Sequence, residues 1–224
     1  MRPYIICHMF SSVDGRIDCT MTEQIDSTDA YYDALDQLQC DSILEGRETL
    51  RLHTAAPEPF VPSSPDPIGH EAVYRVPGTS HYLVGVDTRG SLTWNGPTCD
   101  GSPLLIITSE DCPRAYHDRL TAQGISWIAT GRGAIDLPRA MDLLSEHFSI
   151  HRLALTGGGH INAAFLAEDL IDEVSLMVGA GIDGRAGQTA VFDGIADPTR
   201  PATLLTLTSV EQMGNTVWMR YTMG

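Results

Sequence analysis

The stretch Leu153-Ala154-Leu155-Thr156-Gly157-Gly158-Gly159-His160-Ile161-Asn162 decides the fold class of this chain. An apolar run ends in three consecutive glycines and an amphipathic segment follows, which is typical of a strand, a tight turn and a helix. Glycine at such a turn can adopt positive φ, and without a Cβ it lets a ligand approach the backbone closely. The unpaired N–H groups at the start of the helix favour an anion such as a dinucleotide pyrophosphate. A tight turn without any ligand explains the three glycines equally well, and the full G-x-G-x-x-G fingerprint is not present.

Segments with strand and helix patterns alternate along most of the chain. This alternation predicts the α/β class, with a mostly parallel central sheet flanked by helices. Two β-rich segments near the end, separated by Gly214-Asn215, predict an antiparallel C-terminal hairpin. Helices are expected from Asp26-Ser27 onward, after Glu45, from Pro113 to Gly124, from Pro138, and after the three glycines up to Leu166. Strands are expected at residues 4–10, 41–44, 82–86, 104–109, 125–129, 153–156 and 174–178.

Residues 53–80 contain six prolines and little periodicity. We interpret them as a long loop or insertion within one domain that covers residues 1–224, because strand patterns resume beyond them. Such a loop is usually functional or partly mobile, so it is a candidate flap over a site.

The charge balance limits the possible partners. A formal net charge of −15 disfavours nucleic acid and acidic membranes, and no apolar run is long enough to span a bilayer. Five cysteines without a C-x-x-C pair favour reduced thiols in the cytoplasm, and we expect no metal site. Because the chain has no lysine at all, an anion must be bound by arginine, histidine or backbone N–H groups.

Three predicted strands end in residues that suit a phosphorylated ligand. Ligands of open α/β sheets bind at the carboxyl ends of parallel strands, so we expect these strand ends to converge on one ligand. They offer a guanidinium for bidentate phosphate contact, hydroxyl donors and a backbone anion cradle. The residues are Gly46, Arg47 and Thr49 after one strand, Thr108 and Ser109 after another, and Gly157, Gly158 and Gly159 after the third.

On these motifs the chain resembles the reductase domain of bacterial riboflavin biosynthesis, a pyrimidine reductase with a dihydrofolate-reductase-like fold. The resemblance covers nearly the whole chain. Its first part is the opening strand with the turn Ser12-Val13-Asp14-Gly15, similar to the family's Ser-Leu-Asp-Gly turn. Its second is Gly46-Arg47-Glu48-Thr49, similar to the Gly-Arg-x-Thr of dihydrofolate reductases. Its third is the glycine turn, its helix and Asp172-Glu173-Val174.

The resemblance implies NADPH as cofactor and hydride transfer to a ribosylaminopyrimidine-like or related heterocyclic substrate. It implies that Arg47 and Ser109 contact phosphates of the adenosine half, and that Thr49 and the three glycines hold the pyrophosphate. It also places Asp14 where substrate and nicotinamide meet. Asp14 and His8 are then the first candidates for a catalytic proton donor, and a homodimer is expected because the family usually forms one.

The chain also departs from the family pattern. His8 stands where the family often has lysine, and Tyr31 and Tyr32 occupy a region where an arginine is expected for the substrate's ribose phosphate. These departures leave open an NADPH-binding protein of the same fold without riboflavin-pathway activity, either a sensor or a dihydropteridine-type reductase. An interaction protein that uses the proline-rich loop as its contact surface is a further alternative.

Simpler structural explanations exist for each single residue. Asp14-Gly15 is also a plain turn, and His8 is also a core histidine. Arg47 is also a surface residue paired with Glu48 or Glu45.

Overall fold

The computed structural model describes residues 1–25 and 28–224. The predicted helix start at Asp26-Ser27 therefore lies outside the described residues. The chain divides into two compact units, of which unit 1 contains Met1–Pro3 and Asp41–His151, and unit 2 contains Tyr4–Cys40 and Arg152–Gly224. A single domain over residues 1–224 stays a prediction.

The strands of unit 2 lie side by side in the order β10-β11-β9-β1-β8. The first strand pairs in parallel with both β8 and β9, and its residues Ile5, Ile6 and Cys7 are fully buried. The hairpin β10–β11 turns at Gly214 and joins β9 in antiparallel orientation, as predicted. The strands are β1 (Tyr4–Ser11), β8 (Arg152–Leu155), β9 (Glu173–Val178), β10 (Leu205–Met213) and β11 (Thr216–Met223).

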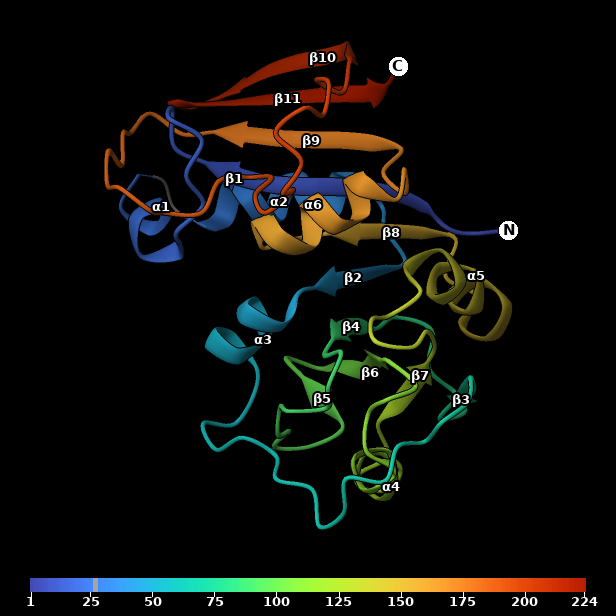
Figure 1. The fold of residues 1–224 in the computed structure, drawn as a ribbon. Coiled ribbons are helices and arrows are strands. Elements are labelled where there is room, and N and C mark those ends of the chain that lie inside the picture. The colour runs from blue at the N-terminus through green and yellow to red at the C-terminus, as the bar shows by residue number, and fades with distance from the viewer. Residues whose placement is uncertain (26–27) are drawn as a thin grey trace. The chain divides into compact units, whose positions relative to one another are not determined.

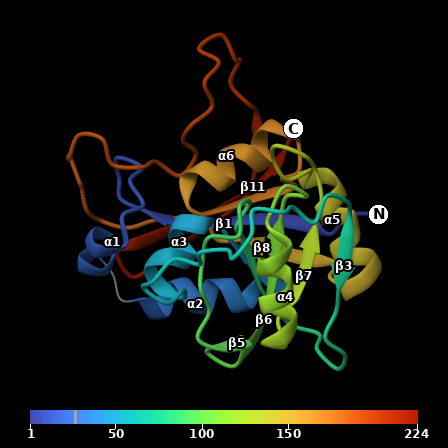
Figure 2. The ribbon, with the colours of Figure 1, turned by 60° about the horizontal axis from the view of Figure 1, so that its bottom comes forward.

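The helices of unit 2 are α1 (Cys19–Ile25), α2 (Thr28–Gln37) and α6 (Gly159–Ala167). In both ribbon views α2 and α6 cover opposite faces of the unit 2 sheet (Figure 1, Figure 2). The apolar face of α2 is buried at Ala34, Leu35 and Leu38, and Tyr31 on the same face is half-buried.

The strands of unit 1 lie in the order β2-β4-β6-β7-β3, and β5 also pairs with β6. The pairs β2–β4, β4–β6 and β6–β7 are parallel, whereas β3 and β5 are antiparallel to their neighbours. The strands are β2 (Ser42–Glu45), β3 (Ala72–Tyr74), β4 (Leu83–Val86), β5 (Thr98–Cys99), β6 (Ser102–Thr108) and β7 (Ser126–Ala129). The helices are α3 (Arg47–His53), α4 (Arg114–Ala122) and α5 (Leu137–Phe148).

Local sequence signals explain how the helices of unit 1 begin and end. The Asp136 carboxylate accepts a hydrogen bond from the N–H of Arg139 and so caps α5. The apolar face of α5 is fully buried at Met141, Leu144 and Phe148. The sequence predicts Pro113 as the first residue of a helix, whereas it is the N-cap residue just before α4.

The proline-rich segment is more ordered than its composition predicts. It contains β3, whose three residues pair with β7 at the edge of the sheet. It is also attached by backbone hydrogen bonds from Ala56 to Thr93 (2.8 Å) and from Phe60 to Ser91 (2.9 Å). The sequence missed β3 because a three-residue, half-buried edge strand between turns has no readable periodicity.

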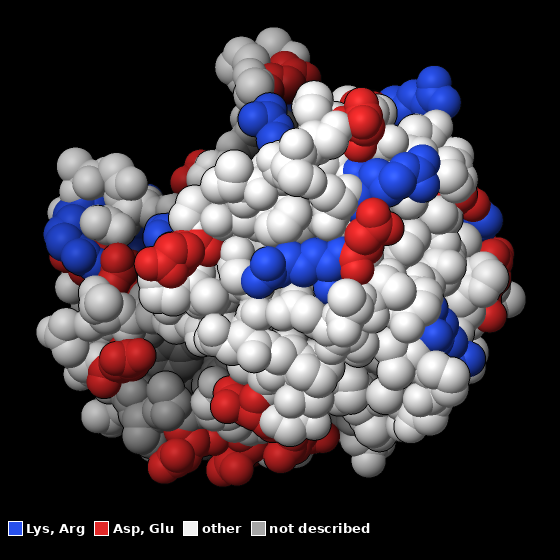
Figure 3. Space-filling model, turned by 90° about the horizontal axis from the view of Figure 1, so that it is seen from below, with Lys and Arg blue, Asp and Glu red and all other residues white. Residues whose placement is uncertain are grey.

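None of the helices in the described ranges combines the length and apolar character needed to cross a bilayer. On the face drawn in Figure 3, basic side chains lie singly, beside acidic ones. This distribution agrees with the acidic composition of the chain.

Candidate functional site

The glycine turn of unit 2 joins β8 to α6 and has the predicted strand–turn–helix form. Gly157 has φ of +95°, and the peptide bond between Gly157 and Gly158 is cis. A Cβ on Gly157 would lie 2.8 Å from Cε of Met9, and one on Gly159 would lie 2.2 Å from the carbonyl oxygen of Ala190. The positive φ of Gly157 and the backbone contact at Gly159 therefore favour glycine at both positions, whether or not a ligand binds.

The same turn presents hydrogen-bond donors. Gly158 is the extended N-cap residue of α6, and no acceptor among the described residues contacts the N–H groups of residues 159–161. Asn162 donates from Nδ2 to the Val191 carbonyl (2.8 Å), while its buried Oδ1 has no partner in the described part of the chain. The donors and the positive end of the α6 dipole fit an anion, as the sequence predicts.

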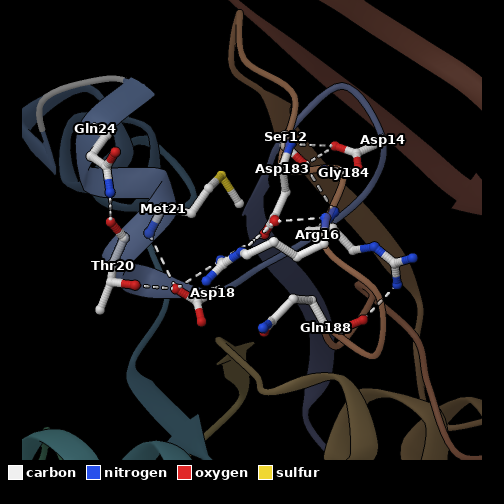
Figure 4. A network of polar contacts seen from close by, with 11 residues as sticks. Ser12, Asp14, Arg16, Asp18, Thr20, Met21, Gln24, Asp183, Gly184 and Gln188 are labelled. Atoms are coloured by element: carbon white, nitrogen blue, oxygen red, sulfur yellow. Dashed lines mark hydrogen bonds and ion pairs between the residues drawn. The ribbon is translucent and has the colours of Figure 1, made fainter.

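The turn after β1 is fastened to the segment 181–189 of the same unit (Figure 4). The Asp14 carboxylate accepts hydrogen bonds from the Ser12 hydroxyl (2.6 Å) and from the N–H groups of Asp183 (3.0 Å) and Gly184 (2.9 Å). These contacts, the Ser12 hydroxyl first, hold the pKa of Asp14 well below its usual range. Asp14 is therefore ionised and is unsuited to the predicted role of proton donor.

His8 is a core residue of unit 2 and not an accessible acid. Its ring is fully buried and stacks on Tyr31 with ring centroids 4.5 Å apart. Trp218 Nε1 donates to Ser175 Oγ (2.8 Å), which donates to His8 Nδ1 (2.9 Å), and His8 Nε2 donates to the Tyr31 carbonyl (3.2 Å). Burial lowers the pKa of His8 to about 4. The predicted catalytic role of His8 is therefore replaced by the core role that the sequence left open.

In unit 1, Gly46 and Arg47 lie where β2 ends and α3 begins. Arg47 is about half exposed (45 %), and its Nε donates to Ser91 Oγ at 3.0 Å. Nη1 pairs with Glu48, whose carboxylate also accepts from Arg51 Nε at 2.9 Å. The ion pair with Glu48 that the sequence left open is therefore present, and such an exposed pair contributes little to stability.

The hydroxyl groups predicted to face a phosphate differ in their accessibility. Thr49 is half-buried in α3. Thr108 is fully buried, and its hydroxyl contacts His117 Nε2 (2.8 Å) and the Ile128 carbonyl (3.3 Å). This differs from the prediction that the Thr108 hydroxyl faces a phosphate. Ser109 is buried too, and its hydroxyl donates to the Thr88 carbonyl (2.9 Å). Successive side chains of a strand point to opposite faces. The sequence pattern did not show that Thr108, at the end of β6, points into the core.

Two features of unit 1 were missed by sequence reasoning. Asp87 and Ser91 contact Arg47, although Asp87-Thr88-Arg89-Gly90 carried only the signal of a strand-ending turn. Glu45 is the last residue of β2, and burial raises the pKa of its carboxyl to about 7. Among the described residues no three His, Cys, Asp or Glu side chains form a group that could hold a metal ion.

The fold is of the dihydrofolate-reductase-like type, a mostly parallel sheet with an antiparallel C-terminal hairpin, and it is shared with solved RibD proteins. The RibD C-terminal domain family model matches residues 3–219, and the chain belongs to this family.

Individual relatives are distant. The chain is similar to the riboflavin biosynthesis protein RibD of Chlamydia muridarum, 27 % identical over 115 residues, which is 49 % of this chain and 30 % of that protein. Acinetobacter baumannii RibD is 19 % identical with a TM-score of 0.73, over all of this chain and 58 % of that chain. A pyrimidine reductase-like protein from Corynebacterium diphtheriae is 18 % identical with a TM-score of 0.72, over 99 % of this chain and 92 % of that one. The chain thus spans well under two thirds of the RibD proteins that it matches.

Proposed function

We propose that this chain is an NADPH-dependent reductase that transfers hydride to a ribosylaminopyrimidine-like or related heterocyclic substrate, as in riboflavin biosynthesis. The observation that carries the proposal is the family match over residues 3–219. The name of the Corynebacterium diphtheriae relative, pyrimidine reductase-like, supports the same reaction class.

The residues of each unit fit one part of the cofactor. In unit 1 the Arg47 guanidinium suits the 2′-phosphate of the adenosine half, because its ion pair with Glu48 is exposed and easily displaced. Gly46 is the N-cap residue of α3, and Thr49 lies in the first turn of that helix. In unit 2 the N–H groups that follow Gly157, Gly158 and Gly159 suit a pyrophosphate oxygen. Convergence of these residues on one ligand involves both units and stays a prediction.

NADPH supplies the hydride when it is bound, and the protein contributes orientation and electrostatics. Asp14 is ionised, so it accepts a hydrogen bond from a substrate N–H or O–H group and does not donate a proton. His8 keeps β1 in place through Ser175 and Tyr31. The proposed mechanism therefore relies on positioning the two rings against each other, with no proton from either residue.

The departures from the family pattern at His8, Tyr31 and Tyr32 favour a second candidate function. An NADPH-binding protein of the same fold without riboflavin-pathway activity, a sensor or a dihydropteridine-type reductase, needs the cofactor residues but no pyrimidine chemistry. NADPH consumption measured against a panel of aminopyrimidines and pteridines separates the two functions. Turnover with an aminopyrimidine supports the reductase, whereas binding without turnover of any panel member supports the sensor.

We further propose that the protein is a cytoplasmic homodimer. Strand β10 forms the edge of the unit 2 sheet and is exposed along most of its length, including Leu205, Leu207 and Val210. A long apolar edge strand is usually covered in a stable protein. Light scattering after gel filtration should give twice the monomer mass, and a glutamate at Leu207 should shift the protein toward monomer.

The cofactor assignment is tested by Arg47→Ala. The change should weaken NADPH binding by about tenfold to a hundredfold, because a hydrogen-bonded charge pair with the 2′-phosphate is lost. NADH binding should change little. Arg75→Ala, which removes an exposed arginine elsewhere in unit 1, is the matched control for overall charge. Equal losses for both nucleotides in Arg47→Ala contradict the assignment.

A further inference from the structure

The Arg47 guanidinium has an inner edge and an outer edge in unit 1. Its inner edge faces the turn after β4, where Nε donates to Ser91 Oγ (3.0 Å) and lies 3.9 Å from Asp87 Oδ1. Its outer edge meets Glu48, whose side chain is 64 % exposed. The inner contacts therefore set the direction in which the outer edge points.

The Ser91 hydroxyl is oriented by the buried carboxylate of Asp87. Ser91 Oγ donates to Asp87 Oδ1 (3.1 Å), which leaves its lone pairs for Arg47 Nε. The Ser91 N–H donates to Asp87 Oδ2 (2.7 Å), so backbone and side chain of Ser91 are held by the same carboxylate. The Ser91 hydroxyl hydrogen is thus donated to Asp87, and the Ser91 oxygen accepts a hydrogen bond from Arg47.

Asp87 itself is fixed by further contacts in the core of unit 1. Its fully buried carboxylate accepts from the Leu92 N–H (2.8 Å) and from the Tyr116 hydroxyl (3.0 Å), which in turn accepts from Trp94 Nε1 (3.0 Å). Gly90 completes the turn with φ of +65°, and a Cβ there would lie 2.4 Å from Cys112 Sγ. The turn has little freedom to move.

We propose that Ser91 is a positioning residue for cofactor discrimination, which holds Arg47 so that the outer edge of its guanidinium meets the 2′-phosphate of NADPH. This inference rests on the proposed function. Arginine has many rotamers, and a binding partner that must order them loses affinity. Ser91 and Asp87 order the arginine before the nucleotide arrives, and the exposed Glu48 carboxylate is readily exchanged for a phosphate.

The test compares Ser91→Ala with the conservative variant Ser91→Thr, which keeps the hydroxyl. Dissociation constants for NADPH and NADH are measured by fluorescence titration of the full chain, with thermal melting to check folding. Ser91→Ala should weaken NADPH binding about threefold to tenfold and leave NADH binding within about twofold, because only the phosphate contact depends on Arg47. Ser91→Thr should restore at least half of that loss in log Kd. Ser63→Ala, an exposed serine of unit 1, is the control and should match the wild type.

The double variant Ser91→Ala with Arg47→Ala distinguishes a positioning role of Ser91 from a purely structural one. Once Arg47 is absent, Ser91→Ala should cause no further loss of NADPH affinity, because the two residues act as one unit. An equal loss for NADPH and NADH in Ser91→Ala, or an additive loss in the double variant, would overturn the role of Ser91 alone. A wild-type protein that binds neither nucleotide would overturn the proposed function and this role with it.

Discussion

The two turns that follow β4 and β1 each contain an aspartate before a glycine, yet they serve different purposes. Asp87 accepts from N–H groups four and five residues further along its own turn, and it is fully buried. Asp14 accepts from N–H groups 169 and 170 residues away, and it is exposed. Asp87 stabilises its own turn, whereas Asp14 connects two segments of unit 2 that are far apart in the sequence. An aspartate directly before Gly15, or three residues before Gly90, therefore indicates a turn but not which groups the carboxylate binds.

The largest expected difference between the turns is their contribution to stability. Asp87→Ala should lower the free energy of unfolding by about 3–5 kcal/mol, because the N–H groups of Ser91 and Leu92 and the Tyr116 hydroxyl lose a buried acceptor. Urea unfolding followed by circular dichroism measures this change. Asp66→Ala, at an exposed aspartate of the same unit, is a suitable control. A loss below about 1 kcal/mol for Asp87→Ala would contradict the difference between the turns.

The pH dependence of the free energy of unfolding should come partly from His8, on the strand of unit 2 that leads into the Asp14 turn. The pKa of His8 is about 4 in the folded protein against an ordinary 6.5, so the unfolded chain binds the proton more readily. Its stabilisation is present above pH 6.5 and is lost as pH falls toward 4, by up to about 3 kcal/mol.

The measurement is the free energy of unfolding between pH 7 and pH 4, in the wild type and in His8→Gln. The variant should lose part of the slope and keep the part that comes from His117, whose pKa burial also lowers to about 4. His117→Gln should lose the part of the slope that comes from His117 and keep the part that comes from His8. If the slope of unfolding free energy against pH were unchanged in His8→Gln, protonation of a group other than His8 would cause the pH dependence.

The smallest expected effect is that of Asp14→Ala. Because the carboxylate is exposed, its loss should lower the melting temperature less than Asp87→Ala does. The local effect should be clear, because hydrogen exchange at the amides of Asp183 and Gly184 should accelerate while Ser91 and Leu92 keep wild-type rates. Unchanged exchange at Asp183 and Gly184 would mean that Asp14 does not fasten this segment.

Much of the fold could be predicted because hydrophobic periodicity and turn residues act locally. The unbroken apolar run at 104–107 gives the buried β6, and Pro138 gives the start of α5 to within one residue. The glycine run correctly marked the transition from β8 to α6. By contrast, β3 depends on pairing with β7, a contact that no short stretch of sequence encodes.

The sequence by itself determined most of the strands and helices, the turn at Asp14-Gly15 and the presence of arginines without any lysine. Only the tertiary structure decided that His8 is buried and neutral, that Thr108 faces the core and that Asp87 and Ser91 hold Arg47. The physical reason is that a turn or a helix end depends on its neighbours in sequence. The protonation state of a histidine and the direction of a guanidinium depend on burial and on partners that lie tens to hundreds of residues away.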